Sequence, residues 1–414
     1  MRGLRSAILL IQPLVLRLLL STWLRLVPVV KQTDWIIDAA NPCELKGCPA
    51  SKPGYINVHV LSHSHIDAGW LQTVDVIYET YATAIYDTTT FALLQKPSRR
   101  FVSAENVFFA RWWRKKPAEI KDSVRKLVLS GRLQFVGGGW TQNDEAVTHY
   151  TATIDQMTLG LRFLNSTFGP QCGVPSVAWQ ADPFGHSVTQ AALFARMGFS
   201  SVMLGRISSD TKNDWQRNRS MEFVWEADSR KQGESEKLEL ETAAVLDAGG
   251  GDGRILAWVP ENTYTTPQAI CFGWNDCLHP EESFRNERLT PSVLIEYARY
   301  QTEVYTNDTV AVMSGCDLCF SDANDRFLKQ DDVLAMANRI SAAQRKRRRV
   351  HVMHSTPACY VEALHSASRE WPRFAGDLMP YTDRPGRTWT GFYTTRPNLK
   401  MMVRYANGFL QASP

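Results

Sequence analysis

The chain has 414 residues, which excludes a peptide-sized or disulfide-only scaffold and is enough for two or three average domains or one large elaborated barrel. Its 46 basic and 42 acidic residues give a net charge of +4, but the first 33 residues contain five basic residues and no acidic one. The remainder therefore carries 46 less 5, or 41, basic residues against 42 acidic ones, and its dense basic run is 345–349. Because no other basic stripe occurs along the sequence, we predict no nucleic-acid partner.

The apolar stretch 6–24 follows two arginines, which is typical of a secretory signal peptide. Gln12, Pro13 and Arg17 interrupt this stretch, so it is a poor membrane span. We predict that residues 1–31 are a cleaved signal peptide or, alternatively, an uncleaved N-terminal anchor or a simple amphipathic helix. Residues 32–54 are then a lead-in segment, and contact with a membrane is expected only if the leader stays uncleaved.

Short β-rich runs alternate with helical stretches along the rest of the chain. Strands are predicted at 56–62, 101–103, 133–136, 177–179, 201–204, 310–313 and 350–353. Helices are predicted at 74–94, 120–129, 154–168, 190–197 and 331–343. Strand followed by helix, repeated, predicts an α/β fold with a parallel sheet or barrel and right-handed crossovers. The glycine-containing stretch 234–253 is predicted to be a surface insertion.

Polar residues follow most of these strands. They are His65, Asp67, Glu105, Asp144, Asp182, Arg206 and Asp317. In parallel α/β folds the loops after the strands open on one face, so we expect these side chains to form one site.

The chemistry of this site begins with His65 and Asp67. Residues two apart in an extended segment point to the same side, so one imidazole and one carboxylate are able to bind one metal ion; the alternative is a histidine hydrogen-bonded to an aspartate at a turn. Asp182 lies in a turn fixed by Pro183 and Gly185, where capping of the turn is the alternative role. If Asp317 faces Asp182 across a pocket, the two carboxylates suit the hydrolysis of a glycoside.

Aromatic and cysteine residues leave further alternatives open. Trp70, Trp113, Trp140, Trp179 and Phe184 suit either stacking on a sugar or, more commonly, packing in the core. Cys316 and Cys319 have CxxC spacing, for which two ordinary thiols are favoured over a redox motif. Asn165, Asn218 and Asn307 are glycosylation acceptors if the chain enters the secretory pathway.

Five segments together carry a family resemblance. HSHIDAGW (63–70), GGGWTQNDEA (137–146), DQMTLGLRFL (155–164), AWQADPFGHS (178–187) and STPACY (355–360) resemble catalytic-domain signatures of the glycoside hydrolase family 38 α-mannosidases, nearest to their lysosomal branch. The resemblance runs from about residue 55 to the C-terminus. It implies a catalytic domain over 55–414, folded as a seven-stranded parallel β/α barrel, with the family's C-terminal helical and β-rich domains absent from this chain.

The resemblance also implies roles for individual residues in the hydrolysis of terminal α-mannose from mannose-containing oligosaccharides. It implies one zinc ion bound by His65, Asp67 and Asp182, with Asp182 as the nucleophile of a retaining double displacement and Asp317 as the general acid/base. Trp70, Phe184 and Arg206 match residues that line the mannose subsite, and Tyr264 is a looser match. The sequence departs from the family around Asp317, where Cys316 and Cys319 replace more usual polar residues.

The resemblance further implies the disulfides Cys48–Cys359 and Cys271–Cys277, and a lysosomal or vacuole-like acidic compartment reached by the secretory pathway, with secretion as the alternative. In the family a fourth zinc ligand comes from a downstream H-H-D motif, and the chain reaches Pro414 without one. With three ligands we expect weaker zinc binding. Because the C-terminal half of the family would cover the outer face of the barrel, we also expect exposed apolar patches there.

The sequence is also compatible with two other functions. One is a catalytically silent family member that binds mannosides or a partner, and the other is a metal-dependent carbohydrate deacetylase, which would not need Asp317. An oligomer is compatible with the sequence.

Overall fold

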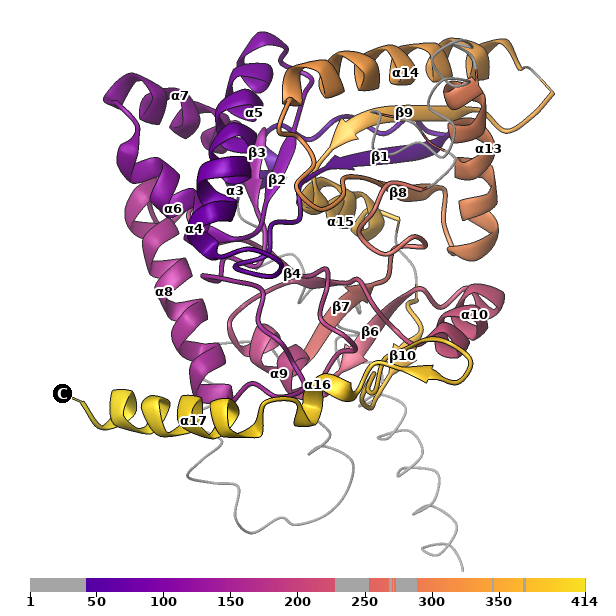
Figure 1. The fold of residues 1–414 in the computed structure, drawn as a ribbon. Helices are drawn as coiled ribbons and strands as arrows, with labels where there is room; N and C mark the ends of the chain where they lie inside the picture. The colour runs from indigo at the N-terminus through magenta and orange to yellow at the C-terminus, as the bar shows by residue number, and fades with distance from the viewer. Residues whose placement is uncertain are drawn as a thin grey trace, which may run out of the picture. The chain divides into compact units, whose positions relative to one another are not determined.

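Three parallel strands form the first sheet, in the order β8–β1–β9. They are β1 (Ile56–Ser62), β8 (Thr309–Ser314) and β9 (Val350–Ser355). Their β-branched runs are almost wholly buried, and helices α13 (Leu289–Val304) and α14 (Ala323–Ala343) lie beside this sheet (Figure 1). The structure is a computed structural model that describes residues 42–227, 253–267, 270, 272, 289–344, 346–367 and 370–413.

The described residues all belong to one unit, which runs from Ala39 to Pro414. The predicted leader 1–31, residues 32–41 of the lead-in segment, residues 234–252 of the insertion and the Cys271–Cys277 pair lie outside the described residues. Among the helices that are described, none is both long enough and apolar enough to cross a bilayer.

A second sheet has five strands in the order β10–β6–β7–β5–β4. They are β4 (Val177–Gln180), β5 (Ser201–Leu204), β6 (Glu222–Glu226), β7 (Arg254–Trp258) and β10 (Arg373–Phe374). β4, β5 and β7 are parallel, whereas β6 pairs antiparallel with β7. Helices α9 (Val188–Arg196) and α10 (Ser209–Asn218) precede β5 and β6, and Phe194, Phe223 and Trp225 pack in the adjoining core.

The third sheet is a parallel pair, β2 (Phe101–Ser103) and β3 (Leu133–Phe135). The helices of this region are α3 (Pro42–Leu45), α4 (Val74–Ile77), a π-helical turn (Tyr78–Ala82), α5 (Thr83–Gln95), α6 (Asn106–Lys115), α7 (Ala118–Leu129) and α8 (Tyr150–Phe168). An aromatic core that includes Phe109, Trp112 and Phe135 holds them together.

The C-terminal part contains α15 (Pro357–His365), the hairpin β11 (Thr382–Arg384) and β12 (Arg387–Thr388), α16 (Gly391–Thr394) and α17 (Pro397–Ala412). Helix α17 lies along the start of α8, where Asn407 Oδ1 accepts a hydrogen bond from the hydroxyl of Thr151 at 2.8 Å (Figure 1). Its apolar side chains are largely in solvent, with Met402 65% and Phe409 76% exposed. Apolar surface is thus exposed on α17.

All seven strands predicted from the sequence are present, as β1 to β5, β8 and β9. The expected closed, seven-stranded parallel barrel is not confirmed, because the strands are divided among small sheets and β6 runs antiparallel. Strands β6 and β7 are consecutive along the chain and neighbours in the sheet, the arrangement in which antiparallel pairing is common. The α/β fold is confirmed in this broader form.

Candidate active site

The loops after several strands deliver polar side chains to one place. His65 and Asp67 follow β1, Asp182 follows β4, Arg206 follows β5, Tyr264 follows β7 and Asp317 follows β8. Glu105, after β2, also joins this group. Asp144 instead caps its own loop, because its carboxylate accepts the N–H of Val147 at 2.7 Å.

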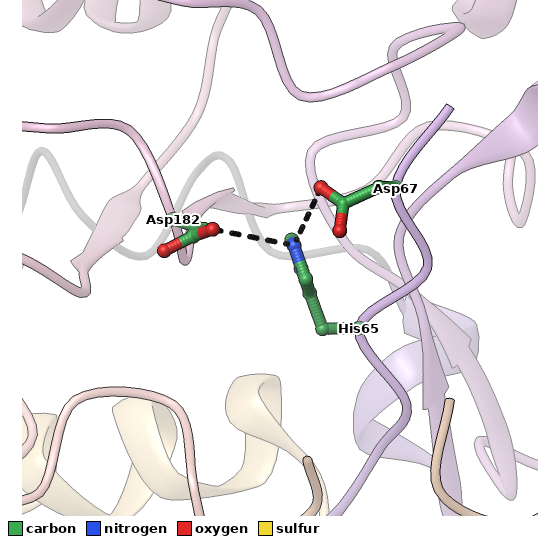
Figure 2. A group of neighbouring side chains, drawn as sticks. All are labelled: His65, Asp67 and Asp182. Carbon is green, nitrogen blue, oxygen red and sulfur yellow. Dashed lines mark hydrogen bonds and ion pairs between the residues drawn. The ribbon is translucent and has the colours of Figure 1, made fainter. Parts of the chain in front are cut away.

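His65, Asp67 and Asp182 form the centre of the site (Figure 2). Nε2 of His65 lies 3.2 Å from Oδ1 of Asp67 and 3.8 Å from Oδ2 of Asp182. One ligand atom from each residue lies within 4.8 Å of those of the other two. The sequence spacing of His65 and Asp67 therefore brings two potential ligands together, and the fold adds the third from a different sheet.

Glu105 faces the other nitrogen of the same imidazole. Its Oε1 lies 3.7 Å from Nδ1 of His65, and both side chains are buried. Burial lowers the pKa of His65, but Asp67, Glu105 and Asp182 outweigh this effect and raise the pKa to about 9. Burial also raises the pKa of Glu105 to about 7, although the charge of His65 opposes the rise.

This set of groups fits a zinc ion. One imidazole nitrogen and two carboxylate oxygens are ligand types that zinc takes, and catalytic zinc sites commonly use three protein ligands and leave a position open. The three carboxylates around His65 favour a cation at this place. If His65 held the ion through Nε2, its Nδ1 would face Glu105, whose Oε1 lies 3.7 Å away, and a carboxylate on that side would help to orient a ligating histidine.

Asp182 is held by its turn and by Arg206. Gly185 in this turn has a φ of 94°, a conformation that glycine adopts without strain. Nε of Arg206 donates to Oδ1 of Asp182, and both side chains are partly buried. Burial raises the pKa of Asp182, while Arg206 and His65 act in the opposite direction, and the net shift is upward.

A buried Glu145–His186 pair contacts the backbone of Arg206. Oε1 of Glu145 lies 2.9 Å from Nδ1 of His186, and both side chains are almost completely buried. The backbone N–H of Arg206 donates to Nε2 of His186 at 3.3 Å. Sequence reasoning assigned no role to either residue, although both lie inside the motifs GGGWTQNDEA and AWQADPFGHS.

Asp317 is exposed at the end of β8 and is oriented by Tyr264. The hydroxyl of Tyr264 donates to Oδ1 of Asp317 at 2.9 Å. Burial and the charges of Asp182 and Asp317 raise the pKa of Tyr264, so the phenol keeps its proton and remains a donor. A Cβ at Gly315 would meet the backbone oxygen of His63 at 2.5 Å, so only glycine fits where the chain approaches the site.

Four aromatic rings surround the guanidinium of Arg206. They belong to Phe184, Tyr264, Tyr381 and Trp389, with centroids 5.3 to 5.9 Å from its central carbon. Phe184 also meets Trp389 edge-on, with centroids 5.0 Å apart. Tyr381 and Trp389 were not predicted, because nothing in their local sequence indicates that the C-terminal hairpin reaches this site.

The other tryptophans have different surroundings. Trp70 is 69% exposed on the loop after β1. Trp113 and Trp179 are buried, which confirms packing for these two, and Trp140 meets Phe163 edge-on.

The cysteines and the glycosylation acceptors are placed as follows. Cys48 is joined to Cys359, as the resemblance implied. Cys43–Cys172 and Cys316–Cys319 are additional disulfides, so the prediction of two ordinary thiols at 316 and 319 is wrong. Asn165 and Asn218 are exposed, whereas Asn307 is buried and its Nδ2 donates to Glu222.

Comparison with known proteins places the chain in a family. The family described as "Glycosyl hydrolases family 38 N-terminal domain" matches residues 55–384. The mouse (Mus musculus) protein named lysosomal alpha-mannosidase is 41% identical over 396 residues, which cover 91% of this chain and 37% of that protein. Its human (Homo sapiens) counterpart is 40% identical over 383 residues, which cover 88% of this chain and 35% of that protein.

A solved structure agrees at the level of the fold. An alpha-mannosidase from Enterococcus faecalis V583 superimposes with a TM-score of 0.56 at 15% identity, over 78% of this chain and 30% of the other. The chain spans about a third of the length of the mouse and human relatives named above. With a family match over most of its length and the His65–Asp67–Asp182 group at its centre, the chain belongs to glycosyl hydrolase family 38, the family of these α-mannosidases.

Proposed function

We propose that this chain hydrolyses terminal, non-reducing α-mannose residues of oligosaccharides with retention of configuration and with the help of one zinc ion. The observation that carries the proposal is the convergence of His65, Asp67 and Asp182 beside a second carboxylate, Asp317. Arg206 and Tyr264 link the two, since Arg206 contacts Asp182, Tyr264 contacts Asp317, and the guanidinium lies 5.7 Å from the tyrosine ring.

The two carboxylates take different roles because their surroundings differ. Asp182 is fixed by its turn and by Arg206, so it is the nucleophile that attacks the anomeric carbon. Asp317 is exposed and held by one phenol, so it protonates the leaving oxygen and later takes a proton from water. Zinc bound by His65, Asp67 and Asp182 supplies Lewis-acid and templating chemistry for the sugar hydroxyls.

The relatives and the four aromatic rings around Arg206, here called the aromatic wall (Phe184, Tyr264, Tyr381 and Trp389), support a substrate class and a compartment. Relatives at about 40% identity are named lysosomal alpha-mannosidases, which supports α-mannosides as substrates and an acidic lysosomal or vacuole-like compartment for this chain. Phe184 and Trp389 offer apolar faces beside Arg206 on which a sugar ring can stack. Three disulfides among the described residues agree with an oxidising lumen.

The test is hydrolysis of 4-nitrophenyl α-mannoside by the purified chain at acid pH, with zinc added or chelated. We expect nitrophenol release that requires zinc and falls at least about a thousandfold in Asp182→Asn. Asp144→Asn is the matched control, because that carboxylate follows a neighbouring strand but only caps its own loop. Proton NMR of the first product should show the α-anomer.

Three results would overturn the proposal. Mannose binding without turnover at any zinc concentration would indicate a silent family member. Acetate release from an acetylated sugar without mannoside hydrolysis would indicate a deacetylase. A β-anomeric first product would exclude retention.

A further inference from the structure

A disulfide brackets the residue proposed as the general acid/base. Cys316 and Cys319 are bonded to each other, three positions apart, with their Cα atoms 5.2 Å apart. That separation lies within the range in which disulfides form. Asp317 is one of the two residues enclosed by the bridge, so the bridge acts directly on the backbone that carries the carboxylate.

The enclosed backbone has an unusual conformation. Leu318, inside the bridge, has a φ of 56°, and Phe320, directly after it, has a φ of 72°. Residues with a side chain rarely adopt positive φ, because Cβ then crowds the backbone, so such a turn persists only where its surroundings hold it. The disulfide supplies a covalent constraint at this turn, and Cys319 and Phe320 anchor its far end in the aromatic core.

The same turn is hydrogen-bonded to the centre of the site. The N–H of His65 donates to the backbone oxygen of Cys316 at 3.1 Å, and the N–H of Leu318 donates to the backbone oxygen of His65 at 2.9 Å. These two bonds join His65 and Asp317 in an isolated parallel β-bridge beyond the ends of β1 and β8. A change in the path of the turn would therefore move the Asp317 carboxylate away from Tyr264 and from the substrate.

From these three observations we infer that the Cys316–Cys319 disulfide is a positioning device for Asp317: it holds the turn that places the carboxylate where acid catalysis is needed. The inference rests on the proposed function, in which Asp317 protonates the leaving group. It assigns a role to two cysteines that are not part of the family resemblance. A turn without the bridge samples other conformations, and the proton is then delivered less often.

The test uses two substrates that differ in their need for acid catalysis. Departure of 2,4-dinitrophenol needs little protonation, whereas departure of phenol depends on it. In Cys316→Ser/Cys319→Ser we expect kcat/KM for phenyl α-mannoside to fall at least about tenfold, while kcat/KM for 2,4-dinitrophenyl α-mannoside changes less than about threefold. Asp317→Asn should produce the same contrast in stronger form.

Two further variants separate positioning from general damage. Cys43→Ser/Cys172→Ser removes a disulfide that does not enclose Asp317 and should leave the ratio of the two kcat/KM values unchanged. Partial loss of folding would lower both values equally. An equal fall for both substrates, or no fall, in Cys316→Ser/Cys319→Ser would overturn the inference while leaving the proposed function intact.

Amide hydrogen exchange, which does not depend on catalysis, completes the test. The amide of Leu318 donates to His65 in the folded chain, so its hydrogen exchange should be at least about tenfold faster in Cys316→Ser/Cys319→Ser than in wild type. Unchanged exchange would overturn the inference even if the wild-type chain hydrolyses no mannoside. Wild-type inactivity on both substrates, by contrast, would count against the proposed function alone.

Discussion

Oε1 of Glu105 lies 3.7 Å from Nδ1 of His65, while Nε2 of the same ring faces Asp67 and Asp182. Glu105 thus faces the side of His65 opposite the proposed metal site and is not itself one of the three proposed ligands. A carboxylate on the Nδ1 side favours a proton on that nitrogen, which would leave the lone pair of Nε2 for a metal ion.

Replacing Glu105 tests this relationship. Glu105→Gln keeps the shape but removes the charge, so we expect zinc affinity to fall about tenfold or more, as outer-shell substitutions commonly do. The measurement is competition for zinc against a chromophoric chelator. Glu119→Gln, on the exposed surface of α7, is the control. Equal affinities for the two variants would show that Glu105 does not support the ligand.

Tyr264→Phe removes the hydroxyl that donates to Asp317. A hydrogen bond to a charged group contributes about 1.5 kcal/mol or more, so we expect kcat for an aryl α-mannoside to fall about tenfold with little change in KM. Tyr305→Phe is the matched control, because its buried hydroxyl donates to the backbone oxygen of Val259 at 2.6 Å. A rise in KM with kcat unchanged would instead place Tyr264 in substrate binding.

Trp389→Ala tests the aromatic wall around Arg206. Loss of a stacking ring costs about 0.5 to 1.5 kcal/mol, so we expect KM for mannosides to rise between about twofold and tenfold. Phe409→Ala, on the exposed face of α17, is the control and should leave KM unchanged. If KM does not rise in Trp389→Ala, the wall only packs against Arg206.

Glu44 makes stability depend on pH. It is buried, it accepts the backbone N–H of Ser176 at 3.2 Å, and burial raises its pKa from 4.5 to about 7. The folded chain therefore binds a proton at Glu44 more tightly than the unfolded chain does. The contribution of this proton to the free energy of unfolding is complete below about pH 4.5 and is lost as the pH rises through about 7.

Glu44→Gln keeps a neutral side chain at every pH. We expect its free energy of unfolding, relative to wild type, to increase between pH 5 and pH 8 by on the order of 2 kcal/mol. Urea unfolding at the two pH values measures this difference. Glu119→Gln should show no such gain, and a constant difference between Glu44→Gln and wild type would contradict the assignment.

The Cys48–Cys359 disulfide closes a loop with a sequence separation of 311, whereas Cys316–Cys319 has a separation of 3. In the chain-entropy account the long loop contributes far more stability, so Cys48→Ser/Cys359→Ser should lower the free energy of unfolding by about 3 to 5 kcal/mol. Cys316→Ser/Cys319→Ser should lower it by much less. Denaturant unfolding of both variants checks this order, and equal losses would refute it.

Several features of this protein follow from local sequence. Strand β1 is predicted at its true bounds because an alternating, β-branched run is a strong local signal for a strand. The same holds for the placement of polar residues after strands, since β–α order alone sets it. His65 and Asp67 share a side because they are two residues apart in an extended segment.

Only the tertiary structure decided which strands pair and which distant side chains meet. The antiparallel β6–β7 pair, the placement of Glu105 behind His65, and the arrival of Trp389 beside Arg206 each join segments through contacts that no local pattern encodes. The Cys316–Cys319 bond likewise depends on the path of one turn. Local spacing determines which groups are available along the chain, whereas packing across separate sheets determines their distances, and the chemistry of the site depends on those distances.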